Sequence, residues 1–132
     1  MIHVWVDGSA KPNPGKGGIG VVIRGDGWDY NLSESCGDRV SNNLAEYMSL
    51  TRALTELMRN EVTDSEILVY SDSLMLVEQM SDREKVDKGG AYVSEYITAK
   101  QLKKSFDKLS FQYIPREENF EANLLASGGT RK

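Results

Sequence analysis

Apolar residues recur along the chain with two different periods, and the period distinguishes expected helices from expected strands. The longest helical pattern begins at Ser41 or Asn42, either of which suits an N-cap, and continues to about residue 59. At about 100° per residue, one side of this helix is apolar and consists of Tyr47, Leu50, Ala53, Leu54, Leu57 and Met58. Short apolar runs typical of buried strands cover residues 2–6, 19–24, 28–36, 67–70 and 109–114. Further helices are expected at about 74–80, 92–107 and 117–126.

The order of these elements predicts the fold class. Three strands, a helix, a strand, two helices, a strand and a final helix follow one another. An antiparallel meander followed by βαβ units predicts an α/β fold with a mixed five-stranded sheet. In this sheet three strands are antiparallel, two further strands are parallel to the first, and helices cover both faces. We expect one domain over residues 1–127 and a frayed tail over 128–132.

Composition restricts the function classes only mildly. The 132 residues carry a formal net charge of −4, which argues against coating nucleic acid by bulk charge but permits a local basic face. Cys36 is the only cysteine, so an internal disulfide is excluded and a reducing, cytoplasmic location is expected. Neither a membrane-spanning segment nor a signal peptide is expected.

The glycine-rich stretch at residues 15–20 is a poor match to a nucleotide-binding loop. Nucleotide-binding loops of the G-x-G-x-x-G and Walker A types lead from a strand into a helix. Here the glycines lead into an expected strand, and no Gly-Lys-Ser/Thr follows. We therefore expect a flexible turn in this stretch.

Three acidic residues form a candidate metal site. Glu46 lies within the apolar arc of the long helix, where a carboxylate is costly unless it is hydrogen-bonded, paired or bound to a metal. Asp7 and Asp72 each follow an expected strand, and the proposed sheet brings the ends of these strands together. Taken singly, the three have ordinary explanations: a first-turn acid, a turn residue and an N-cap. Together they would repel one another without a cation, and oxygen ligands without nearby Cys or His favour Mg²⁺ or Mn²⁺.

Four sequence blocks resemble type 1 ribonuclease H. They are Asp7-Gly8-Ser9 with Asn13-Pro14-Gly15, Ser41-Asn42-Asn43-Leu44-Ala45-Glu46, Tyr70-Ser71-Asp72-Ser73, and Pro115-Arg116-Glu117-Glu118-Asn119-Phe120-Glu121-Ala122. The resemblance covers nearly the whole chain with the blocks in the right order. The short linker at 81–90, in place of a basic handle, is similar to compact archaeal and bacterial members.

The resemblance implies an endonuclease that hydrolyses the RNA strand of RNA–DNA hybrids with two Mg²⁺ ions, for which Mn²⁺ can substitute. Asp7 would contact both ions, and Glu46 and Asp72 would complete the site. The products would carry 5′-phosphate and 3′-hydroxyl ends.

The sequence departs from the family pattern at the fourth metal-site carboxylate, where it has Asn123. An amide keeps one carbonyl oxygen but loses the charge, so we expect weaker binding of one ion and slower turnover. A natural variant and a deliberate substitution both remain open as its origin. The family's loop histidine is also missing, since the only histidine is His3 on the first strand. Arg116 is the alternative candidate there, either binding a phosphate or forming a surface salt bridge.

The resemblance also implies a set of substrate-binding residues. Asn13 and Asn42 would contact 2′-hydroxyl groups, which mark RNA. Ser41 and Asn43 would hold a phosphate of the DNA strand, although helix capping is the alternative role for this segment. The set is completed by Gly8, Ser73, Arg116 and Asn119. The expected partner is the hybrid, with double-stranded RNA as a second candidate, and the chain is expected to act as a monomer away from membranes.

Two rival functions remain. One is a binding module that recognises hybrids or double-stranded RNA without cutting them, natural or engineered. The other is a DNA-cutting transposase core of the same fold, which the Asn42–Asn43 pair and the lack of DNA-binding appendages disfavour.

Overall fold

The computed structural model describes all 132 residues and contains five strands in one sheet. The spatial order is β3-β2-β1-β4-β5. The strand bounds are Ile2–Lys11 for β1, Gly15–Gly25 for β2, Trp28–Val40 for β3, Glu66–Ser71 for β4 and Lys108–Tyr113 for β5. β1, β2 and β3 are antiparallel neighbours, whereas β4 runs parallel to β1 and β5 runs parallel to β4. The predicted fold class is therefore confirmed.

The register between β1 and β4 brings two distant parts of the chain together. Ile2 pairs with Ile67, and the parallel pairing ends where Trp5 pairs with Tyr70. Asp7 and Asp72 both follow two residues later, so the register places them at the same level of the sheet. Asp7 itself still lies within β1, which continues alone beside β2.

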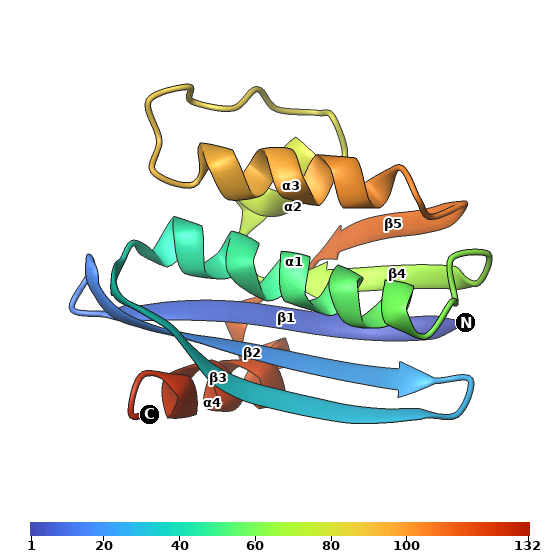
Figure 1. Ribbon diagram of the computed structural model, residues 1–132, viewed down its shortest axis with the longest axis horizontal. Coiled ribbons are helices and arrows are strands. Elements are labelled where there is room, and N and C mark those ends of the chain that lie inside the picture. The colour runs from blue at the N-terminus through green and yellow to red at the C-terminus, as the bar shows by residue number, and fades with distance from the viewer.

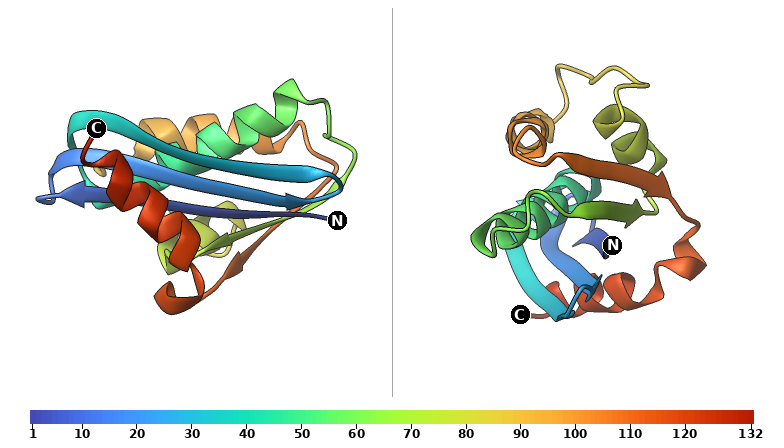
Figure 2. Two further views of the ribbon diagram at one scale, coloured as in Figure 1. Left: turned by 90° about the horizontal axis from the view of Figure 1, so that it is seen from below. Right: turned by 90° about the vertical axis from the view of Figure 1, so that its right-hand side faces the viewer.

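Helices cover both faces of the sheet, as Figures 1 and 2 show. On one face α1 (Asn42–Arg59) packs against β1 and β2, and α3 (Val93–Lys103) packs against α1. The short α2 (Leu74–Met80) lies on the same side against β4 and β5. On the opposite face α4 (Phe120–Gly129) crosses β1, β2 and β3, preceded by a 3₁₀ turn at Arg116–Glu118.

The hydrophobic core lies between the sheet and α1. The apolar arc predicted for the long helix is buried there, because alternate side chains of β1, β2 and β4 point to this face. The fully buried side chains include Val4, Val6, Val21, Ile23, Tyr47, Leu50, Leu54, Leu57, Ile67 and Val69. Ser41 is the N-cap of α1, since its hydroxyl oxygen accepts a hydrogen bond from the Leu44 N–H.

The glycine-rich stretch is strand, not the flexible turn that we predicted. β1 continues to Lys11 and β2 begins at Gly15, so that only residues 12–14 form the connection. The reason lies in α4, whose backbone contacts the sheet directly: a Cβ atom on Gly18 or Gly20 would lie 2.2 Å from the Ala126 or Ala122 carbonyl oxygen. The absence of side chains at Gly18 and Gly20 therefore allows the helix to approach the sheet.

The C-terminal elements differ in their bounds from those expected. α3 ends at Lys103, and the last helix starts later and extends further than the expected 117–126. Residues 128 and 129 are helical, Gly129 is buried against Glu34, and Lys132 donates a hydrogen bond from Nζ to the Ser33 carbonyl oxygen. The helix thus extends into the segment expected to be a tail. Every helix is too short or too polar to cross a lipid bilayer.

Candidate metal centre and nucleic-acid surface

Asp7, Glu46 and Asp72 converge at one point of the fold. One carboxylate oxygen from each lies within 4.8 Å of the others, although the three residues come from β1, α1 and the residue that follows β4. Asp7 is buried, with 3% of its surface exposed, and the other two are partly buried. The inward direction that the helical pattern predicted for Glu46 is confirmed.

Gly8 brings the helix and the strand close enough for this cluster to form. A Cβ atom on Gly8 would lie 2.2 Å from the carbonyl carbon of Ala45 and 2.3 Å from the Glu46 nitrogen. Only glycine allows the backbone of β1 to pack against the Ala45–Glu46 peptide at this separation. Close packing therefore explains why glycine occurs at position 8, without the substrate contact that we predicted for Gly8.

The electrostatics of the cluster suit a cation. Burial, followed by the negative charge of Asp72, raises the pKa of Asp7 to about 7, against the opposing effects of Asn123 and Arg116. Burial also raises the pKa of Glu46 to about 7, against the opposing effect of the nearby Ser73 hydroxyl, and the negative charges of Asp7 and Asp72 raise it further. A divalent cation would favour the ionised form of both acids. The donors are all carboxylate oxygens, which is the ligand type that Mg²⁺ and Mn²⁺ prefer.

Asn123 lies beside the cluster, where the family pattern has a fourth acid. Its Nδ2 donates a hydrogen bond to Asp7 Oδ2 over 3.0 Å. A carboxylate in its place would add a fourth charge, whereas the amide partly compensates the charge of Asp7. Asn123 is only partly buried, so its side chain can reorient.

Ser73 and Arg116 border the cluster in different ways. Ser73 is the N-cap of α2, and its side chain lies close enough to Glu46 to lower the pKa of that carboxyl. Arg116 is exposed and forms no salt bridge, which removes the alternative role considered for it. Its positive charge lowers the pKa of both Asp7 and Glu46, so the guanidinium group lies near the candidate site and is available to an anion.

Asn119 has a different position from the one expected of a substrate contact. Only 1% of its surface is exposed, and its Nδ2 donates to the Val6 carbonyl oxygen over 2.9 Å. The same nitrogen lies 3.5 Å from Asp72 Oδ2. A buried amide with these partners cannot contact a polymer, and spacing along the sequence gave no indication of its burial.

The predicted recognition residues form a connected group at the start of α1. Asn42 Oδ1 accepts a hydrogen bond from the Ala10 N–H over 2.8 Å, and the Asn42 N–H donates to Asn13 Oδ1 over 3.0 Å. Each amide oxygen is thus held by the backbone, which leaves both NH₂ groups free to donate to a ligand. Asn43 is exposed and Ser41 partly so, which gives the α1 N-terminus two further polar groups.

His3 does not belong to the site. Its Nδ1 lies 2.8 Å from the Tyr70 hydroxyl, and its ring stacks with Trp5 and Tyr70. These three partly exposed side chains stack with one another on the α4 face of the sheet.

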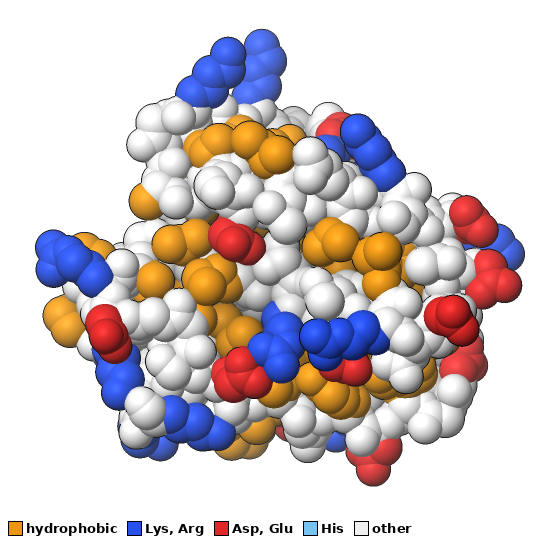
Figure 3. Space-filling model, in the orientation of Figure 1, with side chains coloured by type: hydrophobic (Ala, Val, Ile, Leu, Met, Phe, Trp, Pro, Cys, Tyr) orange, Lys and Arg blue, Asp and Glu red, His pale blue; other side chains and the backbone are white.

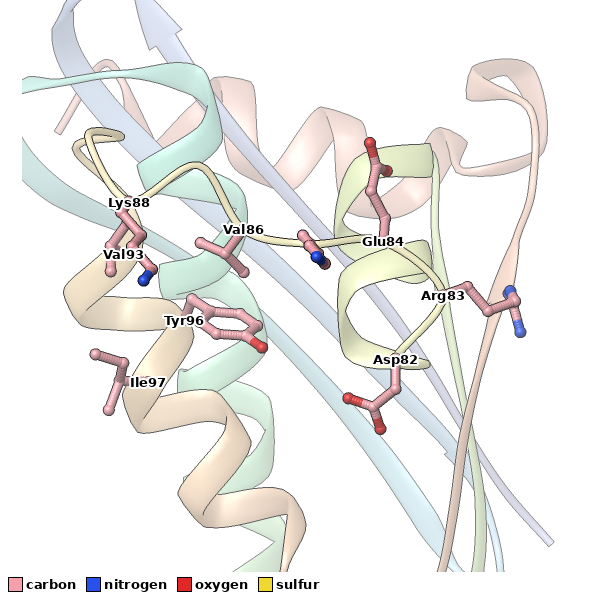
Figure 4. A pocket seen from close by; sticks show the side chains of 9 residues that line it. Asp82, Arg83, Glu84, Val86, Lys88, Val93, Tyr96 and Ile97 are labelled. Carbon is pink, nitrogen blue, oxygen red and sulfur yellow. The ribbon is translucent and has the colours of Figure 1, made fainter.

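A large pocket lies away from the acids. A cavity of about 790 Å³ lies between the linker at residues 82–88 and α3, and Figure 4 shows Val86, Val93 and Tyr96 gathered along it. None of the three acids lines it.

Basic residues do not form a continuous field. Figure 3 shows that, on the side of the molecule seen there, lysine and arginine side chains are separated by acidic and uncharged ones. Two lysines of α3, Lys100 and Lys103, are paired with Asp82. Lys104 and Lys108 are exposed and remain available to a backbone phosphate.

Comparison with known proteins gives a consistent result. The model of the reverse transcriptase-like family matches residues 5–129. The putative hydrolase EbsB of Enterococcus faecalis is 33% identical over 133 residues, which span all of this chain and 96% of that protein. The bifunctional protein Rv2228c of Mycobacterium tuberculosis is 34% identical over 128 residues, 96% of this chain but only 34% of that protein.

Solved structures agree over nearly the whole chain. The N-terminal RNase H domain of Rv2228c superimposes with a TM-score of 0.87 at 30% identity, covering 98% of both chains. LC11-RNase H1 in complex with an RNA/DNA hybrid gives a TM-score of 0.89 at 32% identity, covering 99% of this chain and 97% of that one.

Proposed function

Because the chain belongs to the reverse transcriptase-like family and is a type 1 ribonuclease H of the compact form without a handle, we propose that it hydrolyses the RNA strand of RNA–DNA hybrids. The observation that carries the proposal is the convergence of Asp7, Glu46 and Asp72 within 4.8 Å. The products carry 5′-phosphate and 3′-hydroxyl ends. The chain works as a monomer.

The residues present fit two divalent cations, Mg²⁺ or Mn²⁺. Asp7, Glu46 and Asp72 would hold the cations through their converging carboxylate oxygens. The Asn123 carbonyl oxygen would be available as a further ligand after reorientation of its amide, which now donates to Asp7. The chemistry that the cations supply when bound is polarisation of the scissile phosphate and activation of a water molecule.

The chain's own residues orient the substrate. The Arg116 guanidinium binds a phosphate oxygen next to the scissile bond, because it is exposed, unpaired and close to the acids. The Asn13 and Asn42 NH₂ groups donate to 2′-hydroxyls of the RNA strand, and Ser41 and Asn43 hold a phosphate of the DNA strand. Ser73 lies beside Glu46, where its hydroxyl favours the ionised carboxylate.

A hybrid-cleavage assay tests the proposal directly. A labelled RNA–DNA hybrid is incubated with the protein in Mg²⁺ and in Mn²⁺, and a gel-shift on the same duplex measures binding. Cleavage of the RNA strand alone supports the proposal. Binding without cleavage in either metal favours the second candidate function, a module that binds hybrids or double-stranded RNA. The observation that favours this alternative is the amide of Asn123 beside Asp7, where the family pattern has an acid.

Replacing Asn123 with Asp is expected to raise Mg²⁺-dependent cleavage about tenfold, because the carboxylate restores a charged ligand at the site. Initial rates over a Mg²⁺ titration measure the effect, which should be largest at low Mg²⁺. Asn123→Ala is the matched control, and it should cleave no faster than the unmodified protein. Equal rates for the Asp variant and the unmodified protein would contradict the expected weakening by Asn123.

Replacing Asn42 with Asp is expected to raise the KM for the hybrid about tenfold, because the NH₂ donor is lost and the new charge repels phosphate. The carboxylate still accepts the hydrogen bond from the Ala10 N–H, and an acid in the first turn of α1 is favourable, so the melting temperature should not fall. Steady-state kinetics and thermal melting provide the two measurements.

Asn31→Asp is the control for this charge change. Asn31 accepts a hydrogen bond from Arg24 through its Oδ1, so an Asp there also keeps its partner, and the residue lies on β3 away from Asn13 and Asn42. Its KM should stay unchanged. A similar rise in KM for both variants would show that charge alone weakens binding and would remove the role assigned to the Asn42 amide.

A further inference from the structure

The amide of Asn119 lies between the two segments that carry Asp7 and Asp72. Its Nδ2 donates to the Val6 carbonyl oxygen over 2.9 Å and lies 3.5 Å from Asp72 Oδ2. Both partners can only accept hydrogen bonds, so the chemistry fixes which end of the amide is the NH₂ group. Val6 directly precedes Asp7. The Asn119 side chain therefore links the backbone beside Asp7 to the carboxylate of Asp72.

We propose that Asn119 is a positioning residue that sets Asp72 relative to Asp7 for cation binding. This inference rests on the proposed metal site and deepens it. The final segment of the chain thereby orients the acids through two residues one helical turn apart, Asn119 toward Asp72 and Asn123 toward Asp7.

Fold stability gives a weaker explanation for an amide at this position. Asn119 Oδ1 is buried and has no hydrogen-bond partner, and an unpaired buried acceptor offsets what a hydrogen bond contributes. Asn119 also makes no side-chain capping bond to α4. An apolar side chain of similar size would avoid the unpaired oxygen. It would also lose the hydrogen bond to the Val6 carbonyl oxygen, and it could not hold the Asp72 carboxylate.

Direct contact with the substrate is a second explanation, and burial argues against it. With 1% of its surface exposed, Asn119 reaches the proposed hybrid only through the acids. The two roles predict different kinetics: a positioning residue changes the cation requirement, whereas a substrate contact changes the KM for the hybrid.

The experiment is a calorimetric titration of the metal-free protein with Mn²⁺ at about pH 8, where both acids with raised pKa values are ionised. Asn119→Leu keeps the side-chain volume and removes the donor, and Asn119→Ser is the second variant in case the leucine disturbs folding. Both should bind Mn²⁺ about tenfold more weakly, a typical effect for residues that orient metal ligands. Melting of the metal-free proteins is recorded in parallel, and cleavage is measured as kcat and KM at saturating Mn²⁺.

Weaker Mn²⁺ binding with an unchanged KM for the hybrid supports the positioning role. Unchanged Mn²⁺ affinity in both variants overturns the positioning role. This holds whether the KM for the hybrid rises or only the melting temperature falls, and in either case the proposed nuclease function stands. Failure of the unmodified protein to bind Mn²⁺ would overturn the metal site itself and this inference with it.

Discussion

Replacing Asp7 with Asn is expected to lower hybrid cleavage by about 10³-fold or more, because the central charge of the acid cluster is lost. The amide has almost the same shape, so the packing around Gly8 and α1 should be unaffected. Single-turnover cleavage of a labelled hybrid at saturating Mg²⁺ measures the loss. Retention of more than a small fraction of the rate would remove Asp7 from the centre of the mechanism.

The same substitution should increase the stability of the metal-free protein, even though it lowers the cleavage rate. Burial raises the pKa of Asp7 to about 7, so between about pH 4 and pH 7 the folded state binds more protons than the unfolded state. Stability therefore falls as the pH rises through this range, and an amide at this position removes the contribution of the titrating group. Above neutral pH we expect the Asp7→Asn variant to be more stable by on the order of 2 kcal/mol.

Urea unfolding in EDTA at acidic and alkaline pH measures this difference. The unmodified protein should lose stability toward alkaline pH, and the variant should lose less. An inactive variant that is also less stable at alkaline pH would indicate misfolding instead of a lost metal ligand.

Replacing Gly8 with Ala is expected to destabilise the protein by about 3 kcal/mol, because the added methyl group would overlap the backbone of α1. The overlap is with the Ala45–Glu46 peptide at 2.2–2.3 Å, where no side-chain movement can relieve it. Any relaxation must separate β1 from α1, which also moves Glu46 away from Asp7. Urea unfolding measures the stability, and Mn²⁺ affinity reports on the cluster.

Gly89→Ala provides the matched control for the glycine substitution. Gly89 lies in the linker, and a Cβ atom there would meet only Asp87 Oδ1 at an ordinary 3.6 Å. Its stability should change by less than about 0.5 kcal/mol. If Gly8→Ala proves equally mild, the close packing of strand and helix does not hold Glu46 in place.

Periodicity predicted the elements whose side chains make the core. The bounds of α1 and the inward direction of Glu46 both followed from one apolar arc. It could not predict the strand segments at residues 8–11 and 15–18, because their glycines leave no hydrophobic alternation to detect. Two of these glycines, Gly8 and Gly18, lie against helix backbone instead. The close approach of α4 therefore required the three-dimensional structure.

The candidate site was also only partly predictable from the sequence. Asp7, Glu46 and Asp72 were identified from their positions in expected elements and from a family resemblance. The roles of Ser73 and Asn119 depend on their proximity to acids that are distant in the sequence, and the spacing of residues along the chain does not reveal such proximity. The position of Asn119 four residues before Asn123 was the only available signal.

The register between β1 and β4 has a consequence for how the protein folds. Paired residues such as Ile2 and Ile67 are 65 positions apart (67 − 2), so joining these strands closes a long loop at a large entropic cost. The acids can meet only after this loop has closed, and local helix formation in α1 cannot substitute for it. On the proposed function, cation binding therefore requires this closure, and chains in which β1 and β4 have not yet paired are unable to cut nucleic acid.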